Sequence, residues 1–127
     1  SDADVLLHAV CDAILGALGK GDIGEHFPNT DDHYKDISSL KLLQKVQNIM
    51  TEDGYAVGNV DAVVIAEEPN IKKYKPQMKT QIASMLKIDS SAVNIKATTQ
   101  EGLGSLGNKE GIAAYATVLL FKSGENE

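Results

Sequence analysis

The sequence predicts an α/β fold, an α+β sandwich in which helices cover one face of a mixed β-sheet. Three observations support this prediction. Apolar side chains recur at helical spacing in three segments, β-branched runs lie between and after them, and Gly or Pro residues mark the boundaries. Helical and strand-like segments therefore alternate, which is typical of a layered α/β domain. With 127 residues, the chain has the length of one domain with a buried core.

The first helix is expected over residues 2–18, with Ser1 or Asp2 as its cap. At a step of about 100° per residue, one side of this helix is apolar. The side chains expected to face inward are Leu6, Leu7, Val10, Ile14, Ala17 and Leu18. A glycine-containing irregular segment stops the helix. Residues 28–39 are polar and rich in turn-forming residues such as Pro, Asn, Asp and Ser. This composition predicts a mobile loop that ends at a helix cap.

A second amphipathic helix is expected over residues 38–54, closed by Gly54. Its inward side chains are expected to be Leu40, Leu43, Val46 and Ile49. A strand is expected over residues 58–68, because this segment is strongly β-branched and Pro69 ends it.

A third helix is expected over residues 75–88, with Pro76 tolerated in its first turn. The remaining elements are a strand over 91–99, a Gly-rich turn region over 100–111 and a last strand over 112–121.

The composition argues against several partners. The net charge of −6 disfavours nonspecific binding to nucleic acid, and no apolar run reaches the length of about 18 residues that crosses a membrane. The single cysteine, Cys11, cannot form an internal disulfide, which favours a reducing compartment. All 12 basic residues are Lys, so a bound phosphate must be held by Lys, backbone N–H groups, hydroxyls or a metal.

A polar stripe follows one side of the first helix. On a helical wheel, Ser1, Asp4, His8 and Asp12 lie close together, beside the apolar face. A His and a carboxylate one turn apart can bind Zn²⁺, or the acid can fix the imidazole tautomer while the other ring nitrogen binds the metal. The alternative is a solvated stripe with acids near the helix N-terminus, where the helix dipole favours them.

Two further segments carry polar chemistry. Residues 21–31 place Asp22 and Asp31 where carboxylates could bind the hydroxyls of a sugar-like molecule. Residues 96–107 place Lys96, two Thr hydroxyls and Glu101 at the end of a strand, where they suit phosphate and Mg²⁺. Each segment alone is also explained as an ordinary turn. Together they suggest a phosphorylated polyol and a divalent metal as ligands.

Four stretches closely resemble one family. They are "SDADVLLHAVCDAILGALGKGDIGEHFPNTD", "GNVDAVVIAEEP", "KPQM" and "NIKATTQEGLGSLGNKEGIAA", in this order. The family is that of 2-C-methyl-D-erythritol 2,4-cyclodiphosphate synthase, and the resemblance extends over essentially all 127 residues. It implies a ferredoxin-like fold that assembles as a homotrimer, with active sites between neighbouring subunits. It also implies the non-mevalonate isoprenoid pathway, and therefore a bacterial cytoplasm or a plastid-type organelle.

The reaction that the resemblance implies is a metal-assisted phosphoryl transfer within one small-molecule cytidyl diphosphate substrate, 4-diphosphocytidyl-2-C-methyl-D-erythritol 2-phosphate. The 2-phosphate attacks the β-phosphorus of the cytidyl diphosphate, which closes the cyclodiphosphate and expels CMP. Because phosphoryl transfer depends mostly on positioning and charge neutralisation, no side-chain nucleophile is required.

The resemblance also assigns roles to residues. His8 matches a histidine that binds Zn²⁺ or another divalent ion, and Glu101 matches the carboxylate that holds a second ion, Mg²⁺ or Mn²⁺, on the diphosphate. Ser1 matches a phosphate-contacting serine, and Thr99 a threonine that stabilises the transition state, so both are expected to be catalytic. The residues matched to the erythritol site are Asp22, Ile23, Gly24, Phe27, Asn29 and Asp31. Those matched to the cytidine and diphosphate pocket of the adjacent subunit are Ala66, Pro69, Lys72, Ala97, Thr98 and Thr99.

The chain departs from the family pattern in several places. The family's other two zinc ligands, an Asp-x-His pair on a first strand, would precede Ser1. We therefore expect residues 1–127 to form a single cyclodiphosphate synthase domain without that N-terminal strand region, with weak zinc binding and slow turnover. Asn29 stands where the family often has Asp, and Asn70 where it usually has Lys. Two alternatives stay open: a truncated or inactive trimeric cytidine-nucleotide-binding protein, and a metal-independent carbohydrate-phosphate binder.

Overall fold

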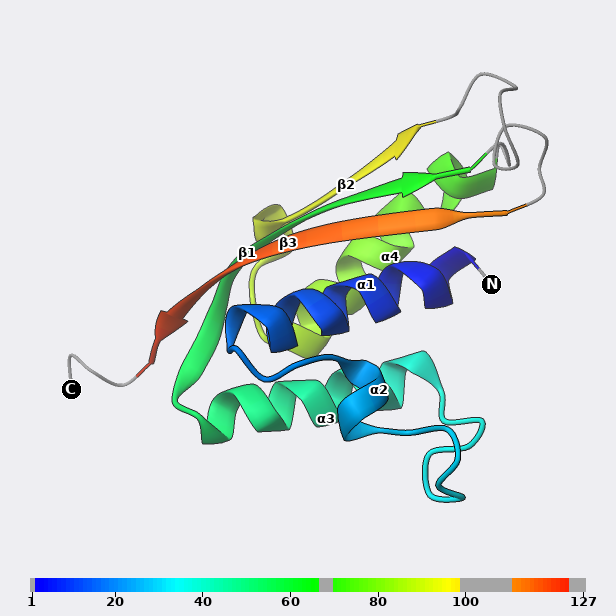
Figure 1. Ribbon diagram of the computed structural model, residues 1–127. Coiled ribbons are helices and arrows are strands. Elements are labelled where there is room, and N and C mark those ends of the chain that lie inside the picture. The colour runs from blue at the N-terminus through cyan, green and yellow to red at the C-terminus, as the bar shows by residue number, and fades with distance from the viewer. Residues whose placement is uncertain (1, 67–69, 99–110, 124–127) are drawn as a thin grey trace.

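The computed structural model describes residues 2–66, 70–98 and 111–123. These residues form a sheet backed by helices (Figure 1). The elements are α1 (Asp2–Ala17), α2 (Ile23–His26), α3 (Ser39–Glu52), β1 (Tyr55–Ile65), α4 (Asn70–Leu86), the 3₁₀ helix η1 (Ser90–Ala92), β2 (Val93–Thr98) and β3 (Ala113–Lys122). Within the described ranges, none of the helices has the length and apolar character needed to cross a membrane.

The three strands form one mixed sheet in the order β2-β1-β3. The central strand β1 runs parallel to β2 and antiparallel to β3, so that Val63 stands opposite Lys96 on one side and Tyr115 on the other. Figure 1 shows α1, α3 and α4 on one side of the sheet, where α1 packs on β3 and α4 on β2. The predicted α+β layer, with helices over one face of a mixed sheet, is confirmed.

A β-bulge in β1 lets apolar side chains on both sides of it face the core. Val57 and Asn59 pair with consecutive residues of β3, so Gly58 is the extra residue. Because side chains alternate between the two faces of a strand, this extra residue lets Val57 and Val60 point to the same buried face. A Cβ at Gly58 would lie 3.3 Å from the carbonyl oxygen of Leu119, so the close approach of the two strands favours glycine.

One face of α1 is buried between β3 and α3. Its buried side chains are Leu6, Leu7, Val10, Cys11, Ile14 and Leu15. The predicted inward face is confirmed except at its end. There Ala17 is exposed and Leu18 is only half-buried, because the chain leaves the core in the last turn of the helix. Burial, aided by the charge of Asp12, raises the pKa of the Cys11 thiol to about 12, so this thiol stays protonated at neutral pH.

The inward face of α3 differs from the predicted one. The helix begins at Ser39, as expected from the Ser38 cap, whose hydroxyl accepts a hydrogen bond from the Lys41 N–H at 3.2 Å. Its buried apolar side chains are Leu42, Leu43, Val46 and Met50, while Ile49 is half-buried. The prediction that Leu40 points inward is wrong. Leu40 precedes Leu42 by about 200° around the helix, so burial of Leu42 turns Leu40 toward solvent.

The helix α4 begins at Asn70, five residues before the predicted start. Pro76 therefore lies inside the helix rather than in its first turn, and that part of the prediction is wrong. Pro76 is exposed, so water can bind the carbonyl group that the missing N–H leaves unpaired. The carbonyl oxygen of Pro76 itself accepts a hydrogen bond from the Thr80 hydroxyl at 2.9 Å.

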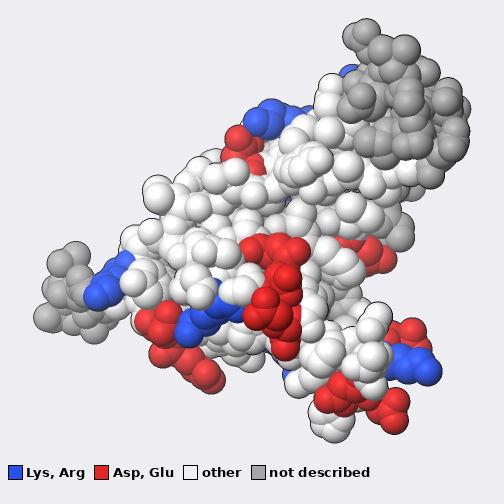
Figure 2. Space-filling model, in the orientation of Figure 1, with Lys and Arg blue, Asp and Glu red and all other residues white. Residues whose placement is uncertain are grey.

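The face of the sheet away from the helices carries exposed apolar side chains. Tyr115, Leu119 and Phe121 of β3 are 63%, 64% and 51% exposed. Figure 2 shows a mostly uncharged surface over β3, whereas acidic side chains gather over the first two helices and the loop that follows them. An apolar patch of this kind on a sheet marks a surface that another molecule can cover.

The residue after α4 gives a test of the backbone. Lys87 has a φ of 60° and ends the helix, with its neighbour Ile88 donating a backbone hydrogen bond to Ala83 at 3.0 Å. Because this conformation is unfavourable for a residue with a Cβ, Lys87→Gly should raise the free energy of unfolding by about 0.5–1 kcal/mol. Lys45→Gly, at an exposed position inside α3, should lower it by about 1 kcal/mol. Urea denaturation measures both, and destabilisation of the Lys87 variant would contradict this account.

Candidate functional site

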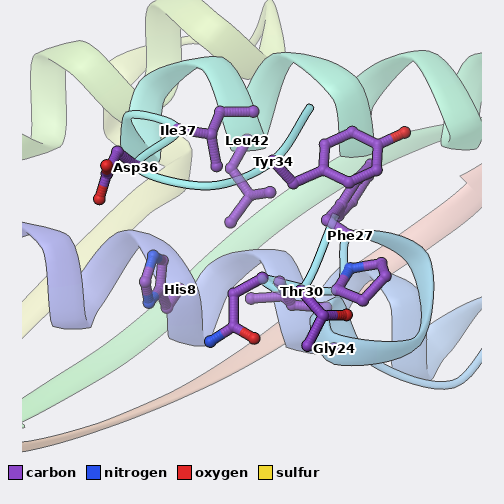
Figure 3. A pocket seen from close by; sticks show the side chains of 11 residues that line it. His8, Gly24, Phe27, Thr30, Tyr34, Asp36, Ile37 and Leu42 are labelled. Carbon is purple, nitrogen blue, oxygen red and sulfur yellow. The ribbon is translucent and has the colours of Figure 1, made fainter. Parts of the chain in front are cut away.

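A pocket of about 450 Å³ lies between α1, α2, the following loop and the start of α3. Five residues that the sequence marked as site residues line it together: His8, Ile23, Gly24, Phe27 and Asn29. The other lining residues are Pro28, Thr30, Tyr34, Asp36, Ile37 and Leu42. Figure 3 shows His8 at one end of the pocket and the rings of Phe27 and Tyr34 at the other.

The short helix α2 forms one wall of this pocket, in a segment that the sequence predicted to be irregular. It has four residues, too few for a helix that is stable on its own, and carboxylates hold its first turn. Asp22 is the N-cap and accepts a hydrogen bond from the Glu25 N–H at 2.9 Å. Asp12 of α1 accepts one from the Ile23 N–H, also at 2.9 Å. Asp22 therefore shapes the wall as a cap and does not line the pocket.

The other end of α2 is tied both to the chain before it and to the loop after it. His26 donates a hydrogen bond from Nε2 to the carbonyl oxygen of Lys20 at 2.6 Å. The next residue, Phe27, packs its ring edge-on against Tyr34, with centroids 5.3 Å apart and an interplanar angle of 75°. This ring pair joins α2 to the loop and closes one end of the pocket.

The loop before α3 is built from local turns. Asp31 accepts the His33 N–H on its carboxylate and the Tyr34 N–H on its carbonyl oxygen, each at 2.9 Å. The Asp31 carboxylate is thus used within the turn and does not line the pocket. Asp36 does line it, with a φ of 61° that is unusual for a residue other than Gly.

His8 reaches the pocket from the polar side of α1. Its ring is exposed, and Nε2 lies 3.3 Å from the hydroxyl oxygen of Ser39, within hydrogen-bonding reach. Ser39 is one of the two buried polar residues in the described part of the chain and is the first residue of α3. Contact with Ser39 constrains the rotation of the imidazole and leaves its second nitrogen for another partner.

The described residues do not complete a metal site by themselves. Across residues 2–66, 70–98 and 111–123, no three His, Cys, Asp or Glu residues come together as metal ligands. His8 fits the role of one ligand, because it is exposed at the pocket and held through one ring nitrogen. A catalytic zinc ion generally takes three protein ligands, so a zinc ion bound at His8 would need further ligands. Glu101, the other predicted metal ligand, lies outside the described residues.

A second group of predicted site residues lies at the carboxyl ends of β1 and β2. The Ala66 N–H donates a hydrogen bond to the Thr98 carbonyl oxygen at 3.1 Å, and Ala97 precedes Thr98 in β2. Lys72 is exposed near the start of α4. None of these four lines the His8 pocket. The predicted residues Ser1, Pro69 and Thr99 fall outside the described parts of the chain.

Lys96, which the sequence suggested for phosphate, has a protein partner. Its ammonium nitrogen lies 3.0 Å from the Asp61 carboxylate, which also accepts a hydrogen bond from the Asn94 side chain at 3.1 Å. These two hydrogen bonds, with the Lys96 charge, lower the pKa of the Asp61 carboxyl below its usual value. The Lys96 side chain is therefore paired with Asp61 on the open face of the sheet.

Sequence reasoning missed several residues of the pocket. Tyr34, Asp36 and Ile37 lie in the loop, and Leu42 is an inward residue of α3 that the predicted face left out. Aromatic and aliphatic side chains in a polar loop, at Tyr34 and Ile37, were the available signal. Such side chains are rarely solvated in a loop without packing against something.

Comparisons with known proteins agree over nearly the whole chain. Residues 1–121 match the YgbB family. A 2-C-methyl-D-erythritol 2,4-cyclodiphosphate synthase from Clostridium kluyveri is 55% identical over 123 residues, which cover 97% of this chain and 75% of that protein. The synthase of the same name from Bacillus velezensis is 56% identical over 123 residues, which cover 97% of this chain and 78% of that protein.

Solved structures show the same fold. The bifunctional IspDF of Campylobacter jejuni aligns with a TM-score of 0.87 and 43% identity, over 93% of this chain. This chain spans only 32% of that bifunctional protein. The CDP complex of IspF from Plasmodium falciparum aligns with a TM-score of 0.82 and 34% identity, over 94% of this chain and 71% of that one.

The ring pair that closes the pocket gives a prediction for this site. Tyr34→Ala should lower the free energy of unfolding by about 1–3 kcal/mol, because it removes both half-buried ring area and the edge-on contact with Phe27. Tyr34→Phe keeps the ring, and Figure 3 shows the hydroxyl directed away from His8, so its effect should stay below about 0.5 kcal/mol. Urea denaturation of the two variants tests this. Equal losses would show that the hydroxyl, not the ring, holds the loop.

Proposed function

This chain belongs to the YgbB family, and we propose that it converts 4-diphosphocytidyl-2-C-methyl-D-erythritol 2-phosphate to 2-C-methyl-D-erythritol 2,4-cyclodiphosphate with release of CMP. The activity is that of a phosphorus–oxygen lyase in non-mevalonate isoprenoid biosynthesis. One observation carries the proposal. In a chain more than half identical to curated synthases, His8 lines a single pocket together with four of the six residues matched to the erythritol site, Ile23, Gly24, Phe27 and Asn29.

The reaction balances within one substrate molecule. An oxygen of the 2-phosphate forms a new bond to the β-phosphorus, and the bond from that phosphorus to the oxygen bridging it to the α-phosphate breaks. The bridging oxygen leaves with CMP. The protein's main task is then to fold the substrate so that its 2-phosphate and β-phosphorus meet.

The erythritol end of the substrate is assigned to the pocket. Ile23 and Phe27 offer apolar contact to the methyl-bearing carbon chain, and Gly24 leaves room for a close approach of the backbone. Asn29 offers an amide for a hydroxyl group. A volume of about 450 Å³ is within the range of ordinary small-molecule sites, which run from roughly 300 to 1,000 Å³.

The cytidine end is assigned to Ala66, Pro69, Lys72, Ala97 and Thr98 of an adjacent subunit. Support comes from the CDP complex of the Plasmodium falciparum relative and from the meeting of Ala66 and Thr98 at the ends of two parallel strands. Ligands commonly bind at the carboxyl ends of parallel strands. Lys72 is exposed in the first turn of α4 and offers an ammonium group for a phosphate.

His8 is proposed as one ligand of a divalent ion, Zn²⁺ or another. Glu101 is proposed to hold a second ion, Mg²⁺ or Mn²⁺. Bound divalent ions would neutralise part of the diphosphate charge, which matters in a chain without Arg. Ser1 and Thr99 are proposed to contact the reacting phosphates.

We also propose that residues 1–127 make up a single synthase domain. The compartment is proposed to be the bacterial cytoplasm, as for the bacterial relatives, or a plastid-type organelle.

A homotrimer is proposed for two reasons. The His8 pocket and the residues assigned to cytidine form separate groups, so a shared site would draw one group from each of two neighbouring subunits. The open face of the sheet also leaves Tyr115, Leu119 and Phe121 exposed, and subunit contact would remove them from water.

The activity is tested by the release of CMP from the diphosphocytidyl substrate with Zn²⁺ and Mg²⁺ present. His8→Ala should lower kcat/KM by more than about 100-fold, because it removes the proposed metal ligand at the pocket. His33→Ala serves as the matched control, because His33 is exposed and does not line the pocket, and it should stay within about threefold of the wild type. Binding of CDP by the wild type without any CMP release would instead identify a trimeric nucleotide-binding protein.

The assembly is tested by light scattering at micromolar concentration, which should give about three times the chain mass of 13.6 kDa. Leu119→Asp places a charge on the open sheet face and should yield monomers with reduced turnover. Leu40→Asp adds the same charge at an exposed leucine of α3 and should leave the trimer intact. A trimer that tolerates Leu119→Asp would show that another surface forms the interface.

A further inference from the structure

We propose that Asp12 is the positioning residue of the pocket, which holds α2 at a fixed place relative to His8 through the Ile23 backbone. The inference rests on the proposed function, because the wall that α2 provides is the one assigned to the erythritol end of the substrate. It deepens that function by giving a role to a carboxylate that does not line the pocket.

The contact itself is a hydrogen bond between two separate elements. Asp12 of α1 accepts the Ile23 N–H on Oδ1 at 2.9 Å, across eleven residues of sequence. Ile23 is the first residue of α2, where the N–H group has no partner within the helix. A carboxylate is a strong acceptor for such a group, because the hydrogen bond is charge-assisted and the N-terminal end of a helix favours negative charge.

Polar contacts add to a partial apolar packing of α2, because Ile23 and the C-cap Phe27 are only partly buried against the core. None of its four residues is buried, so no deeply buried side chain fixes the helix against the core. Its cap, Asp22, is adjacent in sequence and fixes only the local shape of the first turn. The bond from Asp12 is different because it comes from another helix and so fixes where α2 lies.

The position of Asp12 on α1 makes this anchor useful for the site. His8 and Asp12 are one helical turn apart, with a rise of about 6 Å between them. The opposite face of α1 is buried, with Leu6, Val10 and Ile14 fully enclosed, so this spacing is rigid. A single helix therefore presents one pocket side chain and also anchors the wall that carries Gly24 and Phe27.

The sequence allowed another role for Asp12, as a partner that orients the His8 imidazole. In the structure, His8 and Asp12 make different contacts. The His8 ring contacts Ser39, and Asp12 accepts the Ile23 N–H. Within the described residues, Asp12 is also not part of a group of three possible metal ligands. Its effect on the pocket therefore runs through the backbone of α2.

Two substitutions separate a backbone anchor from a needed charge. Asp12→Ala removes the acceptor, so KM for the diphosphocytidyl substrate should rise about tenfold, while kcat stays within about threefold. Asp12→Asn keeps an Oδ1 acceptor without the charge, so it should restore KM to within about threefold of the wild type. An unchanged KM in Asp12→Ala, or an Asn variant as impaired as the Ala variant, overturns the proposal.

A matched control comes from Asp89. This exposed carboxylate also accepts a backbone N–H, that of Ser91, at 2.9 Å and caps a short turn away from the pocket. Asp89→Ala should lower stability to a similar extent and leave KM unchanged. A rise in KM in this variant equal to that in Asp12→Ala would mean that general destabilisation, not the anchor, moves the pocket, and the proposal would fail.

Amide hydrogen exchange at Ile23 tests the anchor without any turnover. Exchange should become at least about tenfold faster in Asp12→Ala, return to the wild-type rate in Asp12→Asn and stay unchanged in Asp89→Ala. Unchanged exchange in Asp12→Ala overturns the anchor. If the wild type releases no CMP and the Ile23 amide still responds in this pattern, the proposed function fails and the anchoring of α2 by Asp12 stands.

Discussion

The site depends on burial of one face of α1 between the sheet and α3. Leu6, Val10 and Ile14 are fully enclosed there, so the helix cannot rotate without opening the core. Its polar face is consequently fixed in direction, and it carries His8 and Asp12 one turn apart. The short α2 adds no buried residue of its own. The positions of the pocket residues therefore depend on the packing of α1, although the buried side chains of α1 do not themselves line the pocket.

The long elements of the fold were predictable because each leaves a repeated pattern in the sequence. The first helix and the central strand bury enough apolar side chains for their period to be read. The exceptions have local causes. The four residues of α2 are too few to show a helical period. Asp12, which stabilises them, lies eleven residues before Ile23, and the sequence alone does not show that the two residues meet. Leu40 and Leu42 both suit an apolar face, and only the packing of α3 selects Leu42.

His8 was indicated by the polar stripe of the first helix, but the other predicted pocket residues were identified only by resemblance, and the reason is physical. Ile23, Gly24 and Phe27 are unremarkable in a glycine-containing segment, because their meaning comes from the helix and turn that bring them beside His8. The acids Asp22 and Asp31 were singled out for their chemistry, but both carboxylates are used to build turns. Local hydrogen bonding to the backbone is a common use of Asp side chains in turns, so the residue type alone does not identify these two as ligand-binding groups.

The two ends of the proposed substrate make different demands on the fold, and the structure meets them in different places. The branched polyol is assigned to an open pocket, for which α2 and the loop with Tyr34 provide apolar side chains. The proposed nucleotide end is assigned to the carboxyl ends of two parallel strands, where Ala66 and Thr98 meet. The pocket is fixed by the packing of α1, and the strand ends are fixed by the pairing of β1 with β2. The two groups of residues therefore cannot come together within one subunit without disrupting one of these contacts. If the proposed function holds, an active site shared between copies would bring the two groups of residues onto one substrate, which is the physical argument for the proposed homotrimer.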